Sequence, residues 1–270
     1  MTGQQAGPRV VDRAQWRTER VQLLELEKSL TRARDVLNRM RRELPAVRVA
    51  QPYEFTGPGG TSTLLDLFEG RRQLIVQHVM FGPGWRQACA GCAFQADSLG
   101  HLAHLHARDT TFAAVSRAPY PELAAFRKRM GWEFPWYSSA GSTFNYDFGV
   151  SLDERVAPID WNYRTAPELR QAGLGAIADA EELPGVSVFL RAGPPGEEHV
   201  LHTYSTYARG VEPLLGTYAL LDLTPLGRGE GWDGMPSVGA GREWIRLHDE
   251  YATADGISCE HTFDGQGLEH

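Results

Sequence analysis

The sequence is poor in cysteine, in long apolar runs and in basic residues. Three cysteines among 270 residues are too few for the disulfide framework of a secreted scaffold. No apolar run approaches the roughly 18 residues of a membrane-spanning helix, and the first twelve residues hold no signal-peptide core. The formal net charge is -7, whereas a nucleic-acid surface needs concentrated positive charge. We therefore expect a cytoplasmic protein that binds neither nucleic acid nor a membrane.

An amphipathic helix is predicted for residues 12–43, where apolar side chains recur at roughly helical intervals. Asp12 is placed as its N-cap, with Gln15 three residues on, and Pro45 closes the pattern. Because the heptads are irregular, we expect this helix to pack on its own domain. A coiled coil that makes the protein a homo-oligomer stays open as the alternative.

The rest of the chain alternates between strand and helix patterns. The predicted elements are a hairpin at 53–65, a strand at 74–81, a helix at 92–108, a strand at 111–116, a helix at 121–130, an aromatic connection with short helices at 132–183, two antiparallel strands at 186–191 and 199–206, and helices at 213–221 and 242–251. This is the element order of the thioredoxin fold, an α/β fold with a central mixed sheet and flanking helices. His78, inside the first long strand, is expected to be a satisfied core residue.

Cys89 and Cys92 are separated by Ala90 and Gly91 and stand at the start of a predicted helix. The first residues of a helix offer unpaired backbone N–H groups and a partial positive charge, which stabilise a thiolate. Cys89 is therefore the predicted nucleophile, and Cys92, one turn further on, the predicted resolving thiol. The predicted site contains no cofactor and no metal.

Three further residues are assigned to this site. Pro184 directly precedes the strand that opens the terminal hairpin, and we expect a cis peptide bond there that faces the dithiol. Arg86 lies in the loop before Cys89, and Arg117 ends the neighbouring strand at the edge where open α/β sheets place their sites. Either arginine could stabilise a thiolate or an anionic substrate, and an ordinary surface salt bridge is at least as well supported for each. Trp85 is equally suited to form a wall of the site or to cap the core.

Six stretches resemble a bacterial thioredoxin-like family of unknown function that is labelled a predicted dithiol-disulfide oxidoreductase. They are LTRARD at 30–35, LDLFEGRRQL at 65–74, FNYDFGV at 144–150, HTYSTYARG at 202–210, LDLTPLGR at 221–228 and HDEY at 248–251. The resemblance implies a thioredoxin-like fold with a dithiol over nearly the whole chain.

A wider similarity is to peroxiredoxins and alkyl hydroperoxide reductases, but the motif around their reactive cysteine is missing. That motif has Thr or Ser three residues before the cysteine and Pro seven before, where this chain has Arg86 and Gly82. Peroxide reduction is therefore the weaker expectation.

The pattern predicts four parts: a helical extension at 1–50, a thioredoxin-like domain at 51–224, a loop and helix at 225–267, and the start of a vector-encoded tag at 268–270. The expected activity is thiol-disulfide exchange, with a protein or small-molecule disulfide as substrate and a cellular thiol as reductant. Cys259 is treated as an incidental thiol.

Two other functions compete with redox chemistry. A zinc site could combine the cysteines with histidines 101, 104 and 106, although a continuous helix would put His101 about 13 Å along the axis from Cys92. A binding or scaffold protein with an idle dithiol would use Tyr204, Tyr207 and the aromatic connection as its surface.

Overall fold

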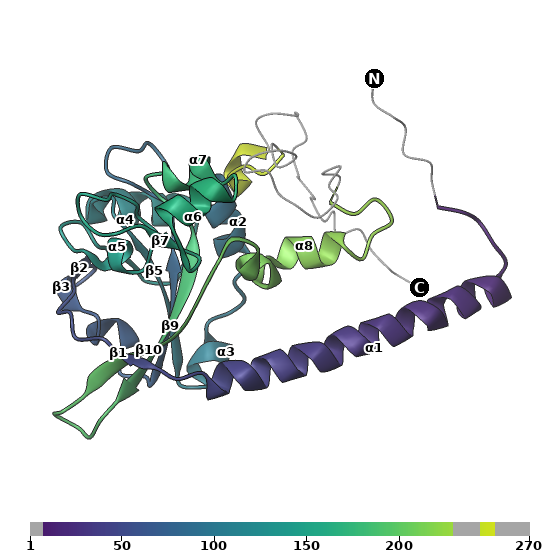
Figure 1. The fold of residues 1–270 in the computed structure, drawn as a ribbon, viewed down its shortest axis with the longest axis horizontal. Helices are drawn as coiled ribbons and strands as arrows, with labels where there is room; N and C mark the ends of the chain where they lie inside the picture. Colours follow the sequence, from purple (N-terminus) through teal and green to yellow (C-terminus); the bar gives the residue numbers. More distant parts are fainter. Residues whose placement is uncertain (1–7, 229–243, 252–270) are drawn as a thin grey trace, which may run out of the picture.

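The computed structural model describes residues 8–228 and 244–251, built around a mixed sheet of eight strands in the order β1-β10-β9-β4-β5-β6-β2-β3 (Figure 1). The strands are β1 (Val47–Arg48), β2 (Glu54–Gly57), β3 (Gly60–Thr63), β4 (Gln73–His78), β5 (Thr110–Ser116), β6 (Trp136–Ser138), β9 (Gly185–Ala192) and β10 (His199–Tyr207). β4 and β5 are parallel, as are β5 and β6, and the other neighbours are antiparallel. The order β10-β9-β4-β5 is that of the thioredoxin fold, so the predicted fold is confirmed.

The central strand β4 is covered on both faces, as its apolar sequence predicts. Leu74 and Val76 point to one side of the sheet, into a core with Phe189, while Ile75 packs on the other side with α2 (Ala90–Asp97). His78 ends the strand fully buried, and its Nε2 lies 2.8 Å from Ser187 Oγ. Among the described residues its Nδ1 has no hydrogen-bond partner, so the predicted core histidine is only half satisfied.

The helix predicted at 92–108 is wrong in its length. Two separate helices occupy this segment, α2 and the single turn α3 (Ala103–His106). Ser98 Oγ bonds back to Phe94 O at 3.0 Å at the end of α2, which competes with continuation of the helix, and Gly100 follows in the break. The crossover helix α4 (Tyr120–Arg129) ends at Met130, and Gly131 follows with φ of +66°, as its sequence predicts.

The helix predicted at 242–251 is also wrong where the structure describes it. Residues 244–251 contain only a 3₁₀ turn at His248–Glu250, and residues 242–243 lie outside the described part. Side-chain contacts hold this turn: Arg129 binds Asp249 with two hydrogen bonds of 2.6 and 2.9 Å, and His248 Nδ1 lies 2.9 Å from Asp97.

The aromatic connection contributes more to the sheet than its sequence pattern indicates. It supplies β6, and then α5 (Phe144–Asp147), the small hairpin β7 (Asp160–Trp161) and β8 (Arg164–Thr165), α6 (Ala166–Gln171) and α7 (Gly175–Ala178). A separate apolar cluster around Val150, Trp161 and Leu169 joins these elements to Tyr207 on β10. A 3₁₀ segment at Ala208–Leu214 and α8 (Gly216–Leu221) follow the sheet.

Helix α1 (Arg13–Glu43) extends beside the sheet domain rather than packing into it (Figure 1). Asp12 accepts a hydrogen bond from Gln15 N at 2.8 Å, so the predicted N-cap is confirmed. In the part of the chain that the structure describes, no residue of α1 is buried. The expected packing on its own domain is therefore wrong. Within the same residues, no helix is both long and apolar enough to cross a membrane.

Candidate dithiol site

The dithiol lies at the carboxyl end of β4, where the chain loops out and returns at Cys89. Cys89 N–H donates to Met80 O at 3.0 Å, and Met80 N–H donates to Cys92 Sγ at 3.4 Å, so this loop and the dithiol hold each other in place. Gln77 on β4 adds a side-chain bond from Nε2 to Cys92 O at 3.0 Å. Cys89 is the N-cap of α2 and is half-buried, whereas Cys92 is buried. The more accessible thiol is thus Cys89, at the N-terminus of α2.

The two thiols have opposite acidities. The pKa of Cys89 is lowered from 9.0 to about 6, chiefly because the Cys92 thiol donates a hydrogen bond to it. Backbone N–H groups of Cys92 and Gly91 also favour the thiolate, while burial opposes it. The pKa of Cys92 is raised well above its ordinary value by the same thiol pair and by burial. These opposite directions favour a thiolate at Cys89 beside a thiol at Cys92.

A buried carboxylate whose charge reaches the dithiol is the feature that sequence reasoning missed. Glu182 is 3% exposed, and its negative charge is among the causes that raise the pKa of Cys92. Arg117 at the end of β5 donates to Glu182 through Nε, and Ser151 Oγ donates to it at 2.9 Å. Burial raises the pKa of Glu182, and these two donors oppose that rise. Arg117, which we predicted as a site residue, thus acts directly on Glu182.

Tyr146 completes this cluster on the far side of Arg117. The guanidinium of Arg117 donates to the phenol oxygen of Tyr146, and its carbon lies 5.0 Å from the ring centroid. A cavity of about 280 Å³ opens beside the pair, and Pro83 from the loop before Cys89 also lines it. Arg117 therefore borders solvent-filled space that is close to the dithiol loop.

Pro184 stands where the sequence places it, but its predicted geometry is wrong. Gly185 pairs with His78, so Pro184 lies at the same sheet edge as the end of β4. The Leu183–Pro184 bond is trans. Leu183 N–H donates to Val150 O at 2.8 Å, and this contact keeps the chain extended as it enters β9. A trans bond is the ordinary isomer for such an extended entry.

Arg86 lies apart from the Arg117 cluster. It is exposed, and with Trp85 it lines a hollow of about 320 Å³ whose other wall is Phe126 on α4. Trp85 packs against the core cluster that contains Cys92, so its ring serves both as a wall of this hollow and as a cover of the core.

The structure gives no support to a zinc site. Within residues 8–228 and 244–251, no three His, Cys, Asp or Glu side chains are gathered so that they could hold a metal ion. Histidines 101, 104 and 106 belong to α3 and the residues before it, a separate element from the dithiol helix. Cys259 lies outside the described residues.

Comparison with known families gives one match across most of the chain. The family described as "Bacterial protein of unknown function (DUF899)" matches residues 5–251. No curated protein sequence matches.

Solved structures match only loosely. A cysteine-to-serine mutant of peroxiredoxin Q from Xanthomonas campestris is 13% identical, with a TM-score of 0.42, and the match covers 66% of this chain and 97% of that one. Peroxidoxin BcpB from Mycobacterium tuberculosis is 15% identical, with a TM-score of 0.40 and coverage of 64% and 95%. A putative protein disulfide isomerase from Bacteroides thetaiotaomicron reaches 23% identity over 37% of this chain and 63% of that one, with a TM-score of 0.26. Scores this low carry no inference about activity.

Proposed function

We propose that this chain, which belongs to the DUF899 family, is a thiol-disulfide oxidoreductase that works through Cys89 and Cys92. The observation that supports the proposal is the opposite acidity of the two thiols: an accessible thiol with a pKa of about 6 beside a buried one whose pKa is raised. A pKa near or below the ambient pH makes Cys89 a thiolate, which is the reacting form in disulfide exchange.

The reaction then has two steps. The Cys89 thiolate attacks one sulfur of a substrate disulfide, forms a mixed disulfide and releases the other sulfur as a thiolate. Cys92 loses its proton and attacks Cys89 Sγ, which releases the second substrate thiolate and leaves a Cys89–Cys92 disulfide. A cellular thiol reductant returns two electrons and one proton to that pair, which restores the Cys89 thiolate and the Cys92 thiol.

We assign Glu182 as the base that accepts the proton of the Cys92 thiol. Formation of the mixed disulfide removes the negative charge of the Cys89 thiolate, which is one of the causes that hold the pKa of Cys92 high. A buried carboxylate whose own pKa is raised is a stronger base than an exposed one. Arg117 and Ser151 position this carboxylate.

A turnover assay with a model disulfide and a thiol reductant tests the proposal. We expect the wild type to turn over, Cys89→Ser to be inactive, and Cys92→Ser to accumulate a mixed disulfide at Cys89 that mass spectrometry detects. Glu182→Gln should slow the second step more than the first. If wild type and Cys89→Ser are equally inactive on disulfides and hydroperoxides, the dithiol is idle and a binding role replaces the oxidoreductase.

A further inference from the structure

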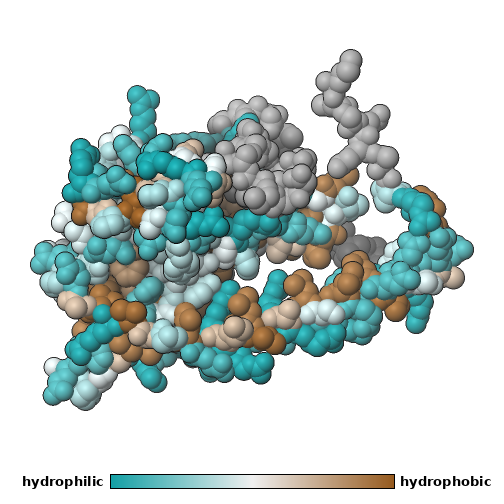
Figure 2. All heavy atoms as spheres, viewed as in Figure 1, coloured by the Kyte–Doolittle hydropathy of each residue, from teal (hydrophilic) through white to brown (hydrophobic). Residues whose placement is uncertain are grey.

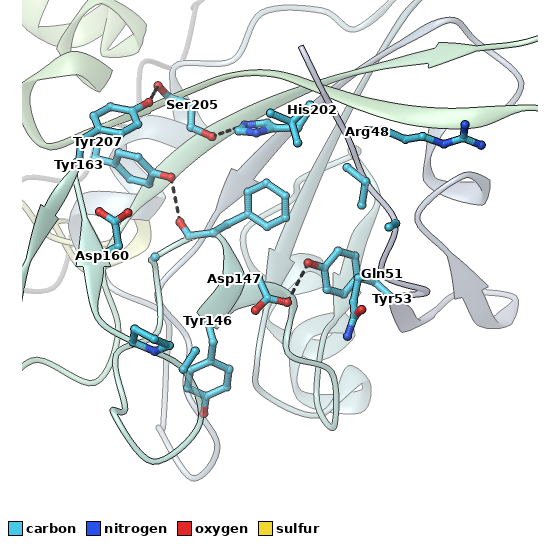
Figure 3. Close-up of a pocket in the computed structure, with 17 residues that line it drawn as sticks. Arg48, Gln51, Tyr53, Tyr146, Asp147, Asp160, Tyr163, His202, Ser205 and Tyr207 are labelled. Atoms are coloured by element: carbon cyan, nitrogen blue, oxygen red, sulfur yellow. Dashed lines mark hydrogen bonds between the residues drawn. The ribbon is translucent and has the colours of Figure 1, made fainter. Parts of the chain in front are cut away.

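A further cavity, of about 570 Å³, lies on the face of the sheet away from α2, and Tyr146 is the one residue of the dithiol cluster described above that also lines it (Figure 3). Residues 47–51, β10 and the aromatic connection supply its walls. The volume is within the range of roughly 300–1,000 Å³ that small-molecule sites occupy.

The hydroxyl groups that line this cavity are already committed to the protein. Tyr163 and Tyr207 donate to the backbone oxygens of Ser205 and Phe148, each at 2.9 Å, and Tyr53 donates to Asp147 at 2.8 Å. Figure 3 marks these hydrogen bonds as dashed lines. A ligand in this cavity therefore finds few free hydrogen-bond donors.

The other polar donors are also spent or directed elsewhere. His202 Nε2 lies 2.8 Å from Ser205 Oγ, and burial lowers the pKa of this histidine, so the ring is neutral near pH 7. The Arg48 side chain points away from the other labelled residues in Figure 3. Arg48 is the one arginine or lysine in the described lining, set against the two carboxylates of Asp147 and Asp160.

Negative charge is what the walls leave free. The Asp160 carboxylate has no hydrogen bond or ion pair among the described residues, and its charge adds to the burial that raises the pKa of both Tyr163 and Tyr207. It therefore lies close to two aromatic rings whose centroids are 6.1 Å apart at an interplanar angle of 73°. Asp147, whose Oδ2 accepts from Tyr53, supplies a second carboxylate.

We propose that this cavity binds an organic ammonium ion. Carboxylates accept its N–H donors or balance its charge, and tyrosine faces attract cations through their ring quadrupoles. A neutral polyol or an anion would gain less from these walls, where Gln51 and Arg48 carry the donors that the hydrogen bonds described above do not use and where both carboxylates repel an anion. The proposal gives a role to Asp160 and Tyr163 of the aromatic connection, which the dithiol chemistry does not use.

Calorimetric titration of the full chain with butylammonium and spermidine tests this site, with butanol as the neutral control at matched ionic strength. We expect saturable binding of the amines, no binding of butanol, and binding about tenfold weaker in Asp160→Asn. Asp179→Asn, a surface carboxylate paired with Arg170, is the matched control and should bind as the wild type does. Cys89→Ser should also bind normally, which separates this site from the redox proposal.

Two results would overturn the cavity proposal. One is the absence of saturable amine binding at millimolar concentration. The other is equal binding by Asp160→Asn and wild type, provided that both unfold at the same temperature.

A second and independent observation concerns α1. Its apolar side chains repeat every seven residues at Trp16, Leu23, Leu30 and Leu37, and the C-cap Leu44 follows at the same spacing; these five are between 46% and 60% exposed. Figure 2 shows apolar side chains along the whole length of the helix. The positions three residues after the repeat hold Glu19, Leu26, Ala33 and Met40, so the apolar spacing of a coiled-coil seam is complete over the three heptads that begin at Leu23.

The geometry points to a second copy of this chain as the partner of α1. A heptad seam is self-complementary, so two identical helices bury the same residues in each other. The helix is about 46 Å long at 1.5 Å per residue.

Light scattering of the full chain at micromolar concentrations tests the dimer. We expect a wild-type dimer, a monomer or a dimer about tenfold weaker for Leu30→Lys, and a dimer for Thr31→Lys, which lies one residue off the seam. A wild-type monomer at all concentrations would overturn the proposal and mean that something other than a second copy covers the seam. A monomeric Thr31→Lys would overturn the seam itself.

Discussion

The acidity of Cys89 provides the sharpest test of the dithiol site. Its pKa of about 6, against 9.0 for an ordinary cysteine, corresponds to about 4 kcal/mol in favour of the thiolate, of which the hydrogen bond from Cys92 is the largest cause. A hydrogen bond to a charged group contributes about 1.5–3 kcal/mol, which equals one to two pKa units. We therefore expect Cys92→Ala to raise the pKa of Cys89 by about one to two units.

The rate of iodoacetamide alkylation, followed by mass spectrometry between pH 4 and pH 10, measures this shift. All variants carry Cys259→Ser, so that only the dithiol reports. In the protein with both thiols the midpoint should lie near pH 6, and Cys92→Ser should fall between it and Cys92→Ala because serine keeps a hydroxyl donor. A midpoint above pH 8 in the protein with both thiols, or one that Cys92→Ala leaves unchanged, would refute the reasoning.

Three further predictions concern stability, measured by urea unfolding. Arg117→Ala should lower the free energy of unfolding by about 3–5 kcal/mol at pH 7, because it leaves the Glu182 carboxylate buried without its ion-pair partner. The loss should be smaller at pH 5, because the raised pKa of Glu182 lets the carboxyl group take up a proton. An equal loss at both pH values would contradict a buried charge at Glu182. Gly149→Ala should lower the free energy of unfolding by at least about 2 kcal/mol, because an added Cβ would lie 2.2 Å from a backbone oxygen. Gly141 also has a positive φ but faces open space, so Gly141→Ala should lower it by about 1 kcal/mol. Equal losses in the two variants would exclude the clash at Gly149. Burial and the nearby His202 lower the pKa of His78 to about 3, so the contribution of neutral His78 to stability is present above pH 6.5 and is lost as the pH falls towards 3. His78→Gln should therefore make the free energy of unfolding depend less on pH in this range. An unchanged pH dependence would exclude protonation of His78 as its cause.

The sheet was predictable from sequence because its long strands carry strong local signals. β4 is an apolar run, and the glycine- and proline-rich turn between β9 and β10 predicts their antiparallel pairing. The strand β6 was missed, since Trp136–Ser138 is only three residues long and its burial comes from β5 and β2 on either side. Short strands of this kind are defined by their neighbours, which lie far away in the sequence.

In the dithiol site too, the features set by local sequence were predictable and those set by distant neighbours were not. The position of Cys89 at a helix start follows from local pattern, but Glu181 and Glu182 look alike in sequence, and only the packing of the strand entry decides that Glu182 is the buried one. The bridge between Ser151 and Glu182 turns that side chain inward, towards Arg117 from a strand more than 60 residues earlier. A carboxylate that is fixed by two distant segments leaves no local signal. In the mechanism that we propose, it is also the base for the second step.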